Sequence, residues 1–214
     1  GIDLGTTNSA IARMENGKPK VLQSDVQKDT MPSCVAINPR KNIIVGDAAY
    51  AANIKDKLRS SKANGKGDSN SYLEFKRTMG KDIKYHSSLL DKDFSSEELS
   101  AEVLKKLKSF ITDEQIKSIV ITVPAMFTLA QNEATINAAK LAGFEVIELL
   151  QEPIAASIAY GLDSKEKDGK WLVFDFGGGT FDAALVKVDD GIMKVLDTEG
   201  NNELGGKDLD LAIV

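Results

Sequence analysis

The chain contains 214 residues, of which 42% are hydrophobic, so it is long enough to bury a packed core as one large domain or two small ones. A net charge of −5, with lysines scattered among acids, argues against nucleic acid or an anionic membrane as the main partner. The single cysteine, Cys34, excludes an internal disulfide, and the single histidine, His86, leaves no cluster with the spacing of zinc ligands.

The chain opens with a predicted hairpin, Gly1–Ala12 (GIDLGTTNSAIA). Asp3 lies between two apolar residues of the first strand, a glycine and two threonines form the turn, and an alternating second strand follows. Asn16-Gly17 predicts a tight turn after that strand. Lys20–Leu22 is therefore predicted to be the third strand of a meander.

A smaller unit is predicted to be inserted after this meander, over residues 33–94. Two short strands, Cys34–Ile37 and Asn42–Val45, precede an alanine-rich helix that runs toward Leu58. The stretch Lys62–Ser71 is rich in Gly, Ser, Asn and Lys, and its composition predicts a mobile loop.

Two capping boxes mark the starts of two helices. Ser95 with Glu98 predicts an amphipathic helix over Ser96–Phe110, in which apolar residues recur at helical spacing. Thr128 with Gln131 predicts a second helix, which a glycine ends.

Two predicted parallel strands alternate with these helices. Ile119–Val123 is a continuous apolar run that predicts a buried strand, and Pro124 ends it. Phe144–Leu150 predicts the next strand, which delivers Glu152 to the carboxyl edge, where α/β folds bind ligands. Pro153 at the first helical position would place Glu152 at the N-cap. From the residues alone, Glu152 either complements the helix dipole or serves a cleft.

A polar stretch, Ser164–Lys170, reads as a linker into Trp171–Val188 (WLVFDFGGGTFDAALVKV). The apolar run closes on Asp175, as in a buried strand that delivers a charged group to a sheet edge. The turn Gly177–Gly179 allows several N–H groups to point at one spot, which suits an anion. From Thr180 the chain alternates again, which predicts a second strand and hence a hairpin with a glycine tip.

This hairpin repeats the opening one. Ile2–Thr7 matches Phe174–Gly179 in order: apolar residue, aspartate, apolar residue, then small turn residues. Glycine triplets also occur in ordinary hairpin turns, so a chance pair is the alternative interpretation. Two such tips facing each other across a cleft would hold a polyphosphate from both sides, with Asp3 and Asp175 on a bound Mg²⁺.

These hairpins resemble the phosphate-binding motifs of the actin-like ATPase superfamily, and more narrowly those of the 70-kDa heat-shock chaperones, the DnaK family. Sugar kinases and actin share the hairpins, but they lack the Glu-Pro connector and the Phe-Lys-Arg segment. The segments that carry the resemblance run in order from one end of the chain to the other: IDLGTTNS, Phe75-Lys76-Arg77, Gln151–Ala156 with Tyr160–Leu162, FDFGGGTFD and Leu204–Asp208.

The resemblance implies an α/β protein with the actin-like ATPase (ribonuclease H-like) fold, in which helices flank a mixed sheet and a smaller subdomain is inserted. It implies a first-lobe core over residues 1–32 and 95–165, the inserted subdomain over residues 33–94, and the start of an incomplete second-lobe core over residues 170–214. We therefore expect the chain to end within the second lobe. Because the family's adenosine-binding part would then lie beyond it, the chain alone is expected to bind nucleotide poorly and to be inactive.

The resemblance also implies which residues are catalytic: Lys76, Glu152, Asp175 and Thr180. Lys76 would stabilise charge on the γ-phosphate of ATP, while Glu152 and Asp175 would orient the attacking water. Thr180 would contact the γ-phosphate region. Arg77 has no implied chemistry, and we expect it to pack or pair at the rim of the cleft.

The implied metal ligands are aspartates. Asp3 and Asp175 would hold Mg²⁺ through its waters, and Asp182 would lie near a K⁺ site. The predicted contacts to the phosphates of ATP or ADP come from the two turns: Gly5, Thr6, Thr7, Asn8, Gly177, Gly178, Gly179 and Thr180.

The implied function is that of the ATP-binding and ATP-hydrolysing domain of a heat-shock molecular chaperone. Hydrolysis of ATP to ADP and phosphate would control the binding of unfolded peptide by a C-terminal domain that this chain lacks. The implied partners are a J-domain co-chaperone and a nucleotide-exchange factor. Asn132 and Glu148 stand where arginines are usual, and the chain is unusually short between Lys76 and Phe94. This pattern resembles a short, specialised branch of the family, so we expect altered contacts with both partners.

Two other functions on the same fold stay open. One is a small-molecule kinase, such as a sugar or acetate kinase, and the other is an actin-like filament protein. The chain has no G-x-x-x-x-G-K-[ST] motif, so it is not a P-loop enzyme. No apolar run reaches membrane-spanning length, and no charged leader precedes an apolar segment, so a cytoplasmic location without membrane contact is expected.

Overall fold

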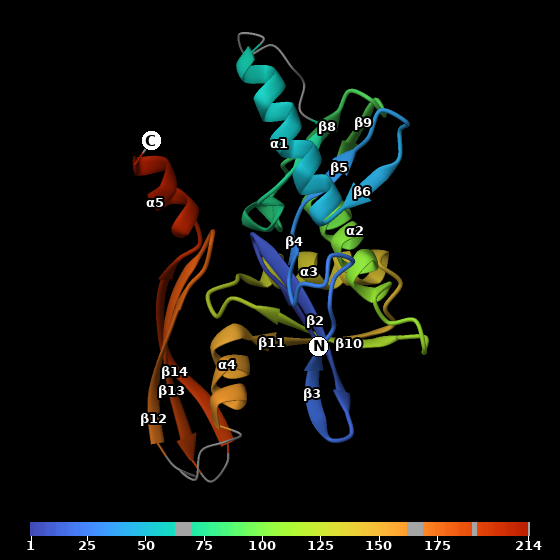
Figure 1. Cartoon of the computed structure of the whole chain (residues 1–214). Coiled ribbons are helices and arrows are strands. Elements are labelled where there is room, and N and C mark those ends of the chain that lie inside the picture. The colour runs from blue at the N-terminus through green and yellow to red at the C-terminus, as the bar shows by residue number, and fades with distance from the viewer. Residues whose placement is uncertain (63–69, 162–168, 190–191, 214) are drawn as a thin grey trace.

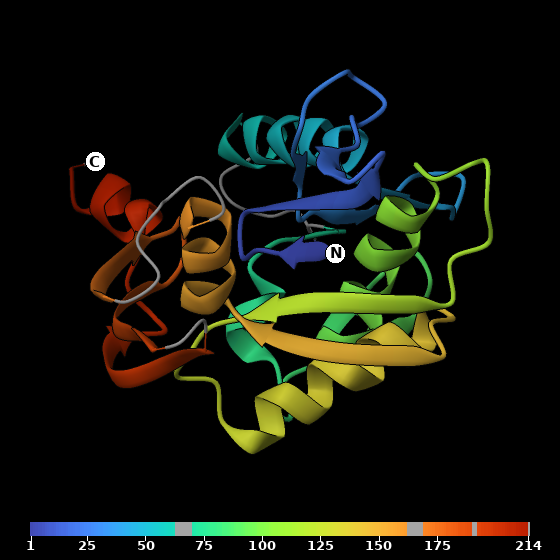
Figure 2. The ribbon, with the colours of Figure 1, turned by 90° about the horizontal axis from the view of Figure 1, so that it is seen from below.

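The computed structural model describes residues 1–62, 70–161, 169–189 and 192–213 (Figure 1). A six-stranded central sheet and a three-stranded C-terminal sheet lie on either side of helix α4 (Glu152–Gly161) (Figure 2). Two small sheets and helix α1 (Asp47–Lys62) form the upper part of the molecule in Figure 1. The mixed sheet with helices on it agrees with the predicted α/β class.

The remaining elements follow in chain order. The strands are β1 (Ile2–Leu4), β2 (Asn8–Glu15), β3 (Lys18–Val21), β4 (Met31–Pro32), β5 (Val35–Ile37), β6 (Ile43–Val45), β7 (Ser71–Tyr72), β8 (Tyr85–Ser87), β9 (Lys92–Phe94), β10 (Ser118–Val123), β11 (Val146–Gln151), β12 (Gly169–Phe176), β13 (Phe181–Asp189) and β14 (Ile192–Asn201). The helices are the 3₁₀ turn η1 (Phe75–Thr78), α2 (Ser96–Lys108), α3 (Leu129–Leu141) and α5 (Gly206–Ile213).

The central sheet joins the predicted meander to the predicted parallel strands. Its order is β11-β10-β1-β2-β3, and β4 pairs with β2. Strand β1 is antiparallel to β2 and parallel to β10, which is parallel to β11. The carboxyl ends of three strands therefore share one edge of the sheet, which brings Gly5, Thr122 and Glu152 to the same place. Asn16 and Gly17, with φ of 52° and 76°, form the tight turn between β2 and β3.

Both predicted capping boxes are present. The Ser95 side chain accepts a hydrogen bond from the backbone N–H of Glu98, whose carboxylate accepts one from the Ser95 N–H at 2.9 Å. Thr128 and Gln131 make the same reciprocal bonds at the start of α3. Each box satisfies two of the N–H groups that a helix start leaves without partners, which fixes where the two helices begin.

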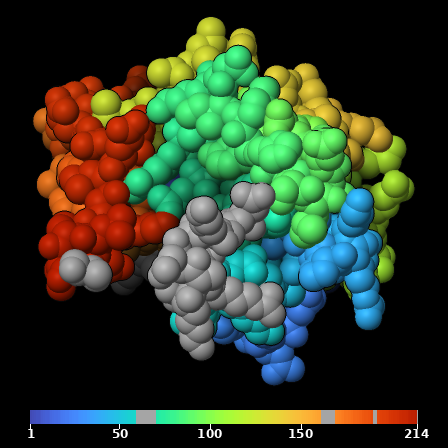
Figure 3. Space-filling model, turned by 90° about the horizontal axis from the view of Figure 1, so that it is seen from above, coloured from blue at the N-terminus to red at the C-terminus, as the bar shows by residue number. Residues whose placement is uncertain are grey.

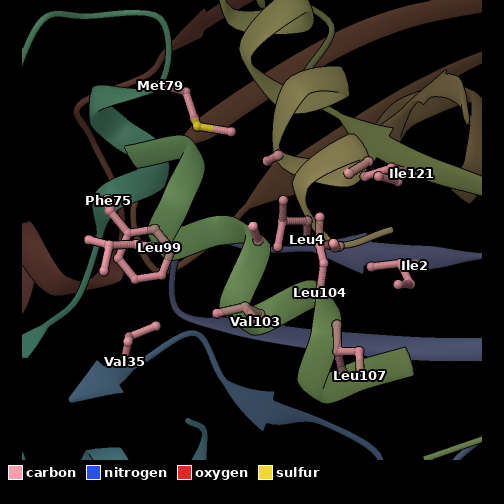
Figure 4. Close-up of a cluster of buried hydrophobic side chains, with 14 of the residues drawn as sticks. Ile2, Leu4, Val35, Phe75, Met79, Leu99, Val103, Leu104, Leu107 and Ile121 are labelled. Atoms are coloured by element: carbon pink, nitrogen blue, oxygen red, sulfur yellow. The ribbon is translucent and has the colours of Figure 1, made fainter. Parts of the chain in front are cut away.

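The hydrophobic core lies between α2 and the central sheet (Figure 4). The apolar stripe of α2 supplies Leu99, Leu104 and Leu107, which are at most 1% exposed. They pack in one cluster with Ile2 of β1 and Ile121 of β10. This packing fixes the strands β1 and β10, whose carboxyl ends form the sheet edge described above, against helix α2.

Two strands that were predicted to be buried are covered on one face only. In β10 the odd-numbered residues are buried, but Val120 is 36% exposed. In β12, Leu172 and Phe174 are 72% and 68% exposed. The prediction was wrong for these faces, because their side chains are partly or largely exposed. An apolar run alone does not say how many of its faces are packed.

Several predicted boundaries shift by a few residues. Helix α4 begins at Glu152 itself rather than after it, and α2 ends at Lys108, two residues before the predicted end. Residues 169 and 170, predicted as linker, belong to β12, while 164–168 lie outside the described residues. The predicted loop Lys62–Ser71 falls mostly on residues 63–69, which also lie outside them.

The only cysteine of the sequence is in the upper part of the molecule. Cys34 is fully buried with Ala36 and Ala49 in a small apolar cluster. This burial raises the pKa of the thiol to about 12. Within the described ranges, no helix combines the length and the apolar character that crossing a membrane requires.

Replacing Ser95 by alanine should lower the free energy of unfolding by about 1 kcal/mol, because the N3 amide of α2 loses its acceptor. Ser95→Asp keeps an acceptor at the same place and adds a negative charge at the helix start, so it should retain most of the stability. Urea titrations followed by circular dichroism measure both variants. Equal losses in the two variants would contradict the capping role.

Candidate functional site

The two repeated turns lie against each other. A β-carbon placed on Gly178 would lie 2.1 Å from the Thr7 Oγ1 atom, and one on Gly179 would lie 2.4 Å from Thr6 Cγ2. Real side chains do not approach this closely, so the second turn reaches the first only because both positions are glycine. The two repeated hairpins therefore meet at their turns.

The two tips form the walls of a cleft of about 490 Å³. Every residue predicted for the site from the sequence lines this cleft except Asp182. Apart from Glu152, helix α4 contributes only the small side chains of alanines to the lining, which leaves room in the cleft. The lining residues are Asp3, Gly5, Thr6, Thr7, Asn8, Lys76, Thr122, Glu152, Ala155, Ala156, Ala159, Asp175, Gly177, Gly178, Gly179 and Thr180.

Hydrogen bonds anchor the first tip from the side away from the cleft. Ser33 donates its backbone N–H to the Thr7 carbonyl at 2.8 Å and its hydroxyl to the Gly5 carbonyl at 2.7 Å. The Ser33 hydroxyl also lies 2.8 Å from that of Ser9. The Gly5 and Thr7 carbonyls are thus occupied, while the N–H groups of Thr6 and Thr7 have no partner among the described residues.

The second tip is anchored in the same manner. The carbonyls of its three glycines accept hydrogen bonds at 2.9–3.1 Å from three donors. The N–H groups of Gly178, Gly179 and Thr180 have no partner in the described part of the chain. Free N–H groups on residues that line one cleft from two sides are the arrangement that binds an anion with several oxygens. The three donor–acceptor pairs are Gly206 N–H to Gly177 O, Lys207 N–H to Gly178 O and Arg77 Nε to Gly179 O.

A buried ion pair lines the cleft together with Asp3 and Asp175. The Lys76 ammonium, on η1, lies 2.9 Å from the Glu152 carboxylate at the start of α4. Lys76 is only 6% exposed, and its Nζ atom lies 5.5 Å from the centre of the Phe127 ring. Burial raises the pKa of Glu152, the lysine opposes that rise, and the charges of Asp3 and Asp175 add to it.

Asp3 and Asp175 each lie one residue before the end of the first strand of their hairpin, and both line the cleft. Thr122 donates its hydroxyl to Asp3 at 3.0 Å, which orients that carboxylate. Partial burial raises the pKa of Asp175, the negative charge of Asp3 raises it further, and Lys76 lowers it. Two carboxylates that repel each other are a site that favours a cation.

The chemistry of this donor set fits Mg²⁺ held through water. No group of three or more His, Cys, Asp or Glu side chains is placed to ligate a metal directly, as far as the described residues go. Mg²⁺ keeps several of its waters and is usually bound by one or two carboxylates together with substrate phosphates. Asp3 and Asp175 match that pattern.

Asp182 lies next to the cleft but not in its lining. It stands directly opposite Asp175 on the neighbouring strand and is only 3% exposed. Its Oδ1 atom has no hydrogen-bond partner among the residues that the structure describes. Burial raises the pKa of Asp182, the charge of Asp175 adds to that rise, and Lys76 opposes it. The K⁺ role implied for Asp182 stays a prediction.

Several residues that build the site were not found from the sequence. The sequence places Thr122 near the end of a strand that stops before Pro124. Its hydrogen bond to Asp3 could not be predicted, because it depends on the register of β1 with β10. Ser33 carries no local signal. Arg77 was expected to pack or pair at the rim, and it pairs there with Asp208 at 2.5 Å. That partner could not be identified because the two residues are far apart in sequence.

Replacing Asp182 by asparagine is expected to raise the free energy of unfolding at neutral pH in a buffer without K⁺. Because the folded chain raises the pKa of Asp182, ionisation costs stability, and asparagine removes that cost. The gain should shrink as the pH falls through the raised pKa toward the ordinary value, where the carboxyl is neutral in both states. Urea titrations at neutral and acidic pH measure it.

Asp189→Asn, at the end of the same strand, is the matched control. Its hydrogen bond from Lys187 lowers the pKa of Asp189, so the sign is reversed and the substitution should not stabilise the protein. A gain for Asp189→Asn equal to that for Asp182→Asn would contradict the assignment of the cost to burial.

Comparison with known proteins identifies the family of the chain. The family model described as "Hsp70 protein" matches residues 1–214. "Chaperone protein dnaK" of Thalassiosira pseudonana is 42% identical over 229 aligned residues, which cover all of this chain and 38% of that protein. "Chaperone protein DnaK" of Ureaplasma parvum serovar 3 is 42% identical over 217, covering all of this chain and 34% of that protein.

A third relative shows the same extent. "Chaperone protein DnaK" of Prochlorococcus marinus (strain MIT 9515) is 43% identical over 229 aligned residues, covering all of this chain and 36% of that protein. The chain thus spans little more than a third of the length of these curated relatives. Because the family model matches every residue from 1 to 214, the chain belongs to the Hsp70 family.

Proposed function

We propose that the complete protein binds Mg·ATP and that this chain forms the first part of its ATP-hydrolysing domain, that of a heat-shock chaperone with the actin-like ATPase fold. The observation that carries the proposal is the contact between the two turns. Their free N–H groups lie on residues that line one cleft from opposite sides. A triphosphate has oxygens on both sides of its chain, so it can accept from both turns at once.

The residues around the turns suit phosphoryl transfer to water. Asp3 and Asp175 would hold Mg²⁺ through its waters, and the bound ion would neutralise part of the phosphate charge. Lys76, fixed by its ion pair, would offer positive charge to the γ-phosphate, and Thr180 would contact the same group. Glu152 would accept a hydrogen bond from the attacking water and so orient it.

Beyond this cleft, the proposal covers what the complete protein does. ATP hydrolysis would control binding of unfolded peptide by another domain, in the cytoplasm, with a J-domain co-chaperone and a nucleotide-exchange factor as partners. Asn132 and Glu148, which stand where arginines are usual in the family, would change the co-chaperone contact. We also propose K⁺ near Asp182 and the two-lobe division of residues 1–32 with 95–165, 33–94 and 170–214. Membership of the Hsp70 family does not favour a small-molecule kinase or a filament protein.

Replacing Lys76 by methionine is expected to slow phosphate release from Mg·ATP by the complete natural protein by about 100-fold. Methionine has nearly the same length but no charge for the γ-phosphate. The matched control is Lys84→Met, because Lys84 is exposed and pairs with another exposed residue, Asp82. Thermal melting checks that the variant is folded. An unchanged rate in folded Lys76→Met would rule out the proposed role.

Replacing Gly178 by alanine is expected to weaken binding of Mg·tripolyphosphate, a probe without the adenosine group. The new methyl group would lie 2.1 Å from the Thr7 hydroxyl, so the two turns must separate, at a cost of about 1–3 kcal/mol. Gly177→Ala is the matched comparison, because its nearest contact would be an ordinary 3.4 Å, and it should weaken binding less. Isothermal titration calorimetry measures both, and equal affinities for wild type and Gly178→Ala would contradict the role of the contact.

A further inference from the structure

Two ion pairs join the η1 region to the start of α5, the helix that follows the last strand of the C-terminal sheet. Arg77 pairs with Asp208 through both of its terminal nitrogens, at 3.2 and 2.5 Å. Glu74, immediately before η1, pairs with Lys207. The red C-terminal part of the chain lies against the green part in the view of Figure 3. We call these four residues the latch.

Arg77 also contacts the Gly177–Gly179 turn through its side chain. Its Nε atom donates to the Gly179 carbonyl at 3.0 Å, while its terminal nitrogens hold Asp208. A guanidinium can do both because its donors lie in one rigid plane. The Arg77 side chain is 18% exposed, so water competes weakly for these bonds.

Asp208 extends this contact along the outer side of the turn. It accepts the Gly205 N–H at 2.8 Å. A β-carbon on Gly205 would lie 2.4–2.6 Å from backbone atoms of Gly178 and Gly179, so the chain before α5 lies directly on the turn. The N–H groups of Gly206 and Lys207 then bond the two remaining carbonyls of the turn. The start of α5 is thus a backing against which the glycine turn rests.

The geometry points to Arg77 as a positioning residue for phosphate binding. It clamps the start of α5 onto the outer side of the Gly177–Gly179 turn, so that the carbonyls are occupied there and the N–H groups stay free for phosphate oxygens. This role rests on the proposed nucleotide function of the cleft, but the clamp itself exists without a ligand. Arg77 acts through the turn and does not line the cleft.

A third ion pair provides an internal control for the clamp. Lys81 and Glu203 also join the η1 region to the segment before α5, but at 3.4 Å and with side chains 49% and 74% exposed. Exposed pairs of this kind contribute little to stability. They do not touch the glycine turn, so their removal should leave phosphate binding unchanged.

The first experiment needs no ligand. Amide hydrogen exchange, followed by NMR, is measured on wild type, Arg77→Gln, Arg77→Lys and Lys81→Gln. In Arg77→Gln the bonded amides of Gly206 and Lys207 should exchange about 10- to 100-fold faster, since charge-assisted hydrogen bonds are lost. Arg77→Lys, which keeps the charge but not the planar fork, should be intermediate. Lys81→Gln should match wild type.

The amides of α2 distinguish positioning from general stability. They should exchange at the wild-type rate in every variant, because the core beneath them is not touched. A uniform rise that includes α2 would show that Arg77 only stabilises the fold, and it would overturn the proposal. Unchanged exchange of Gly206 and Lys207 in Arg77→Gln would overturn it as well.

The second experiment tests the consequence for phosphate binding. Calorimetry with Mg·ATP and with Mg·tripolyphosphate, on the complete natural protein, should show at least about a tenfold weaker affinity for Arg77→Gln and no change for Lys81→Gln. Equal affinities of wild type and Arg77→Gln would overturn the positioning role. If wild type bound neither probe, the proposed function would fail, while faster exchange in Arg77→Gln would still establish the clamp.

Discussion

The van der Waals contact between Thr7 and Gly178 is the constraint on which the site depends. It joins two turns that are far apart in sequence, and the missing β-carbons of the second turn are what make the approach possible. The N–H groups of the two turns do not bond the carbonyls of the opposite turn. Donors from outside the turns bond carbonyls of both: Ser33 at the first turn, and Arg77 with the start of α5 at the second. The fold thus leaves the N–H groups of both turns free at one cleft.

The electrostatics of the cleft follow from one buried lysine among several acids. Lys76 lowers the pKa of Glu152, Asp175 and Asp182, yet the pKa of each stays above its ordinary value because burial and mutual repulsion outweigh its effect. The ligand-free cleft therefore has a surplus of negative charge at the ends of the two strands. A divalent cation would reduce that repulsion, which explains why a cleft proposed to receive an anionic phosphate chain also contains aspartates.

Local signals in the sequence predicted the local structure well. The two capping boxes fixed the starts of α2 and α3, and the repeated Asp-x-Gly pattern identified both turns, because capping and turn formation depend on residues a few positions apart. What depended on distant partners was missed. Asp208 became identifiable only when the fold brought it to Arg77, and the exposed faces of β10 and β12 could not be told from buried ones, since an apolar strand looks the same whichever neighbours it has.

The burial of Cys34 has a practical consequence. Its thiol is enclosed by apolar side chains and stays protonated at physiological pH, whereas alkylating reagents attack thiolates. The native chain should therefore react very little with maleimides. A pair of cysteines introduced on the surface, one on α1 and one on α5, would carry fluorophores without a competing label. Energy transfer between the two dyes would then report how far the cleft opens and closes in solution.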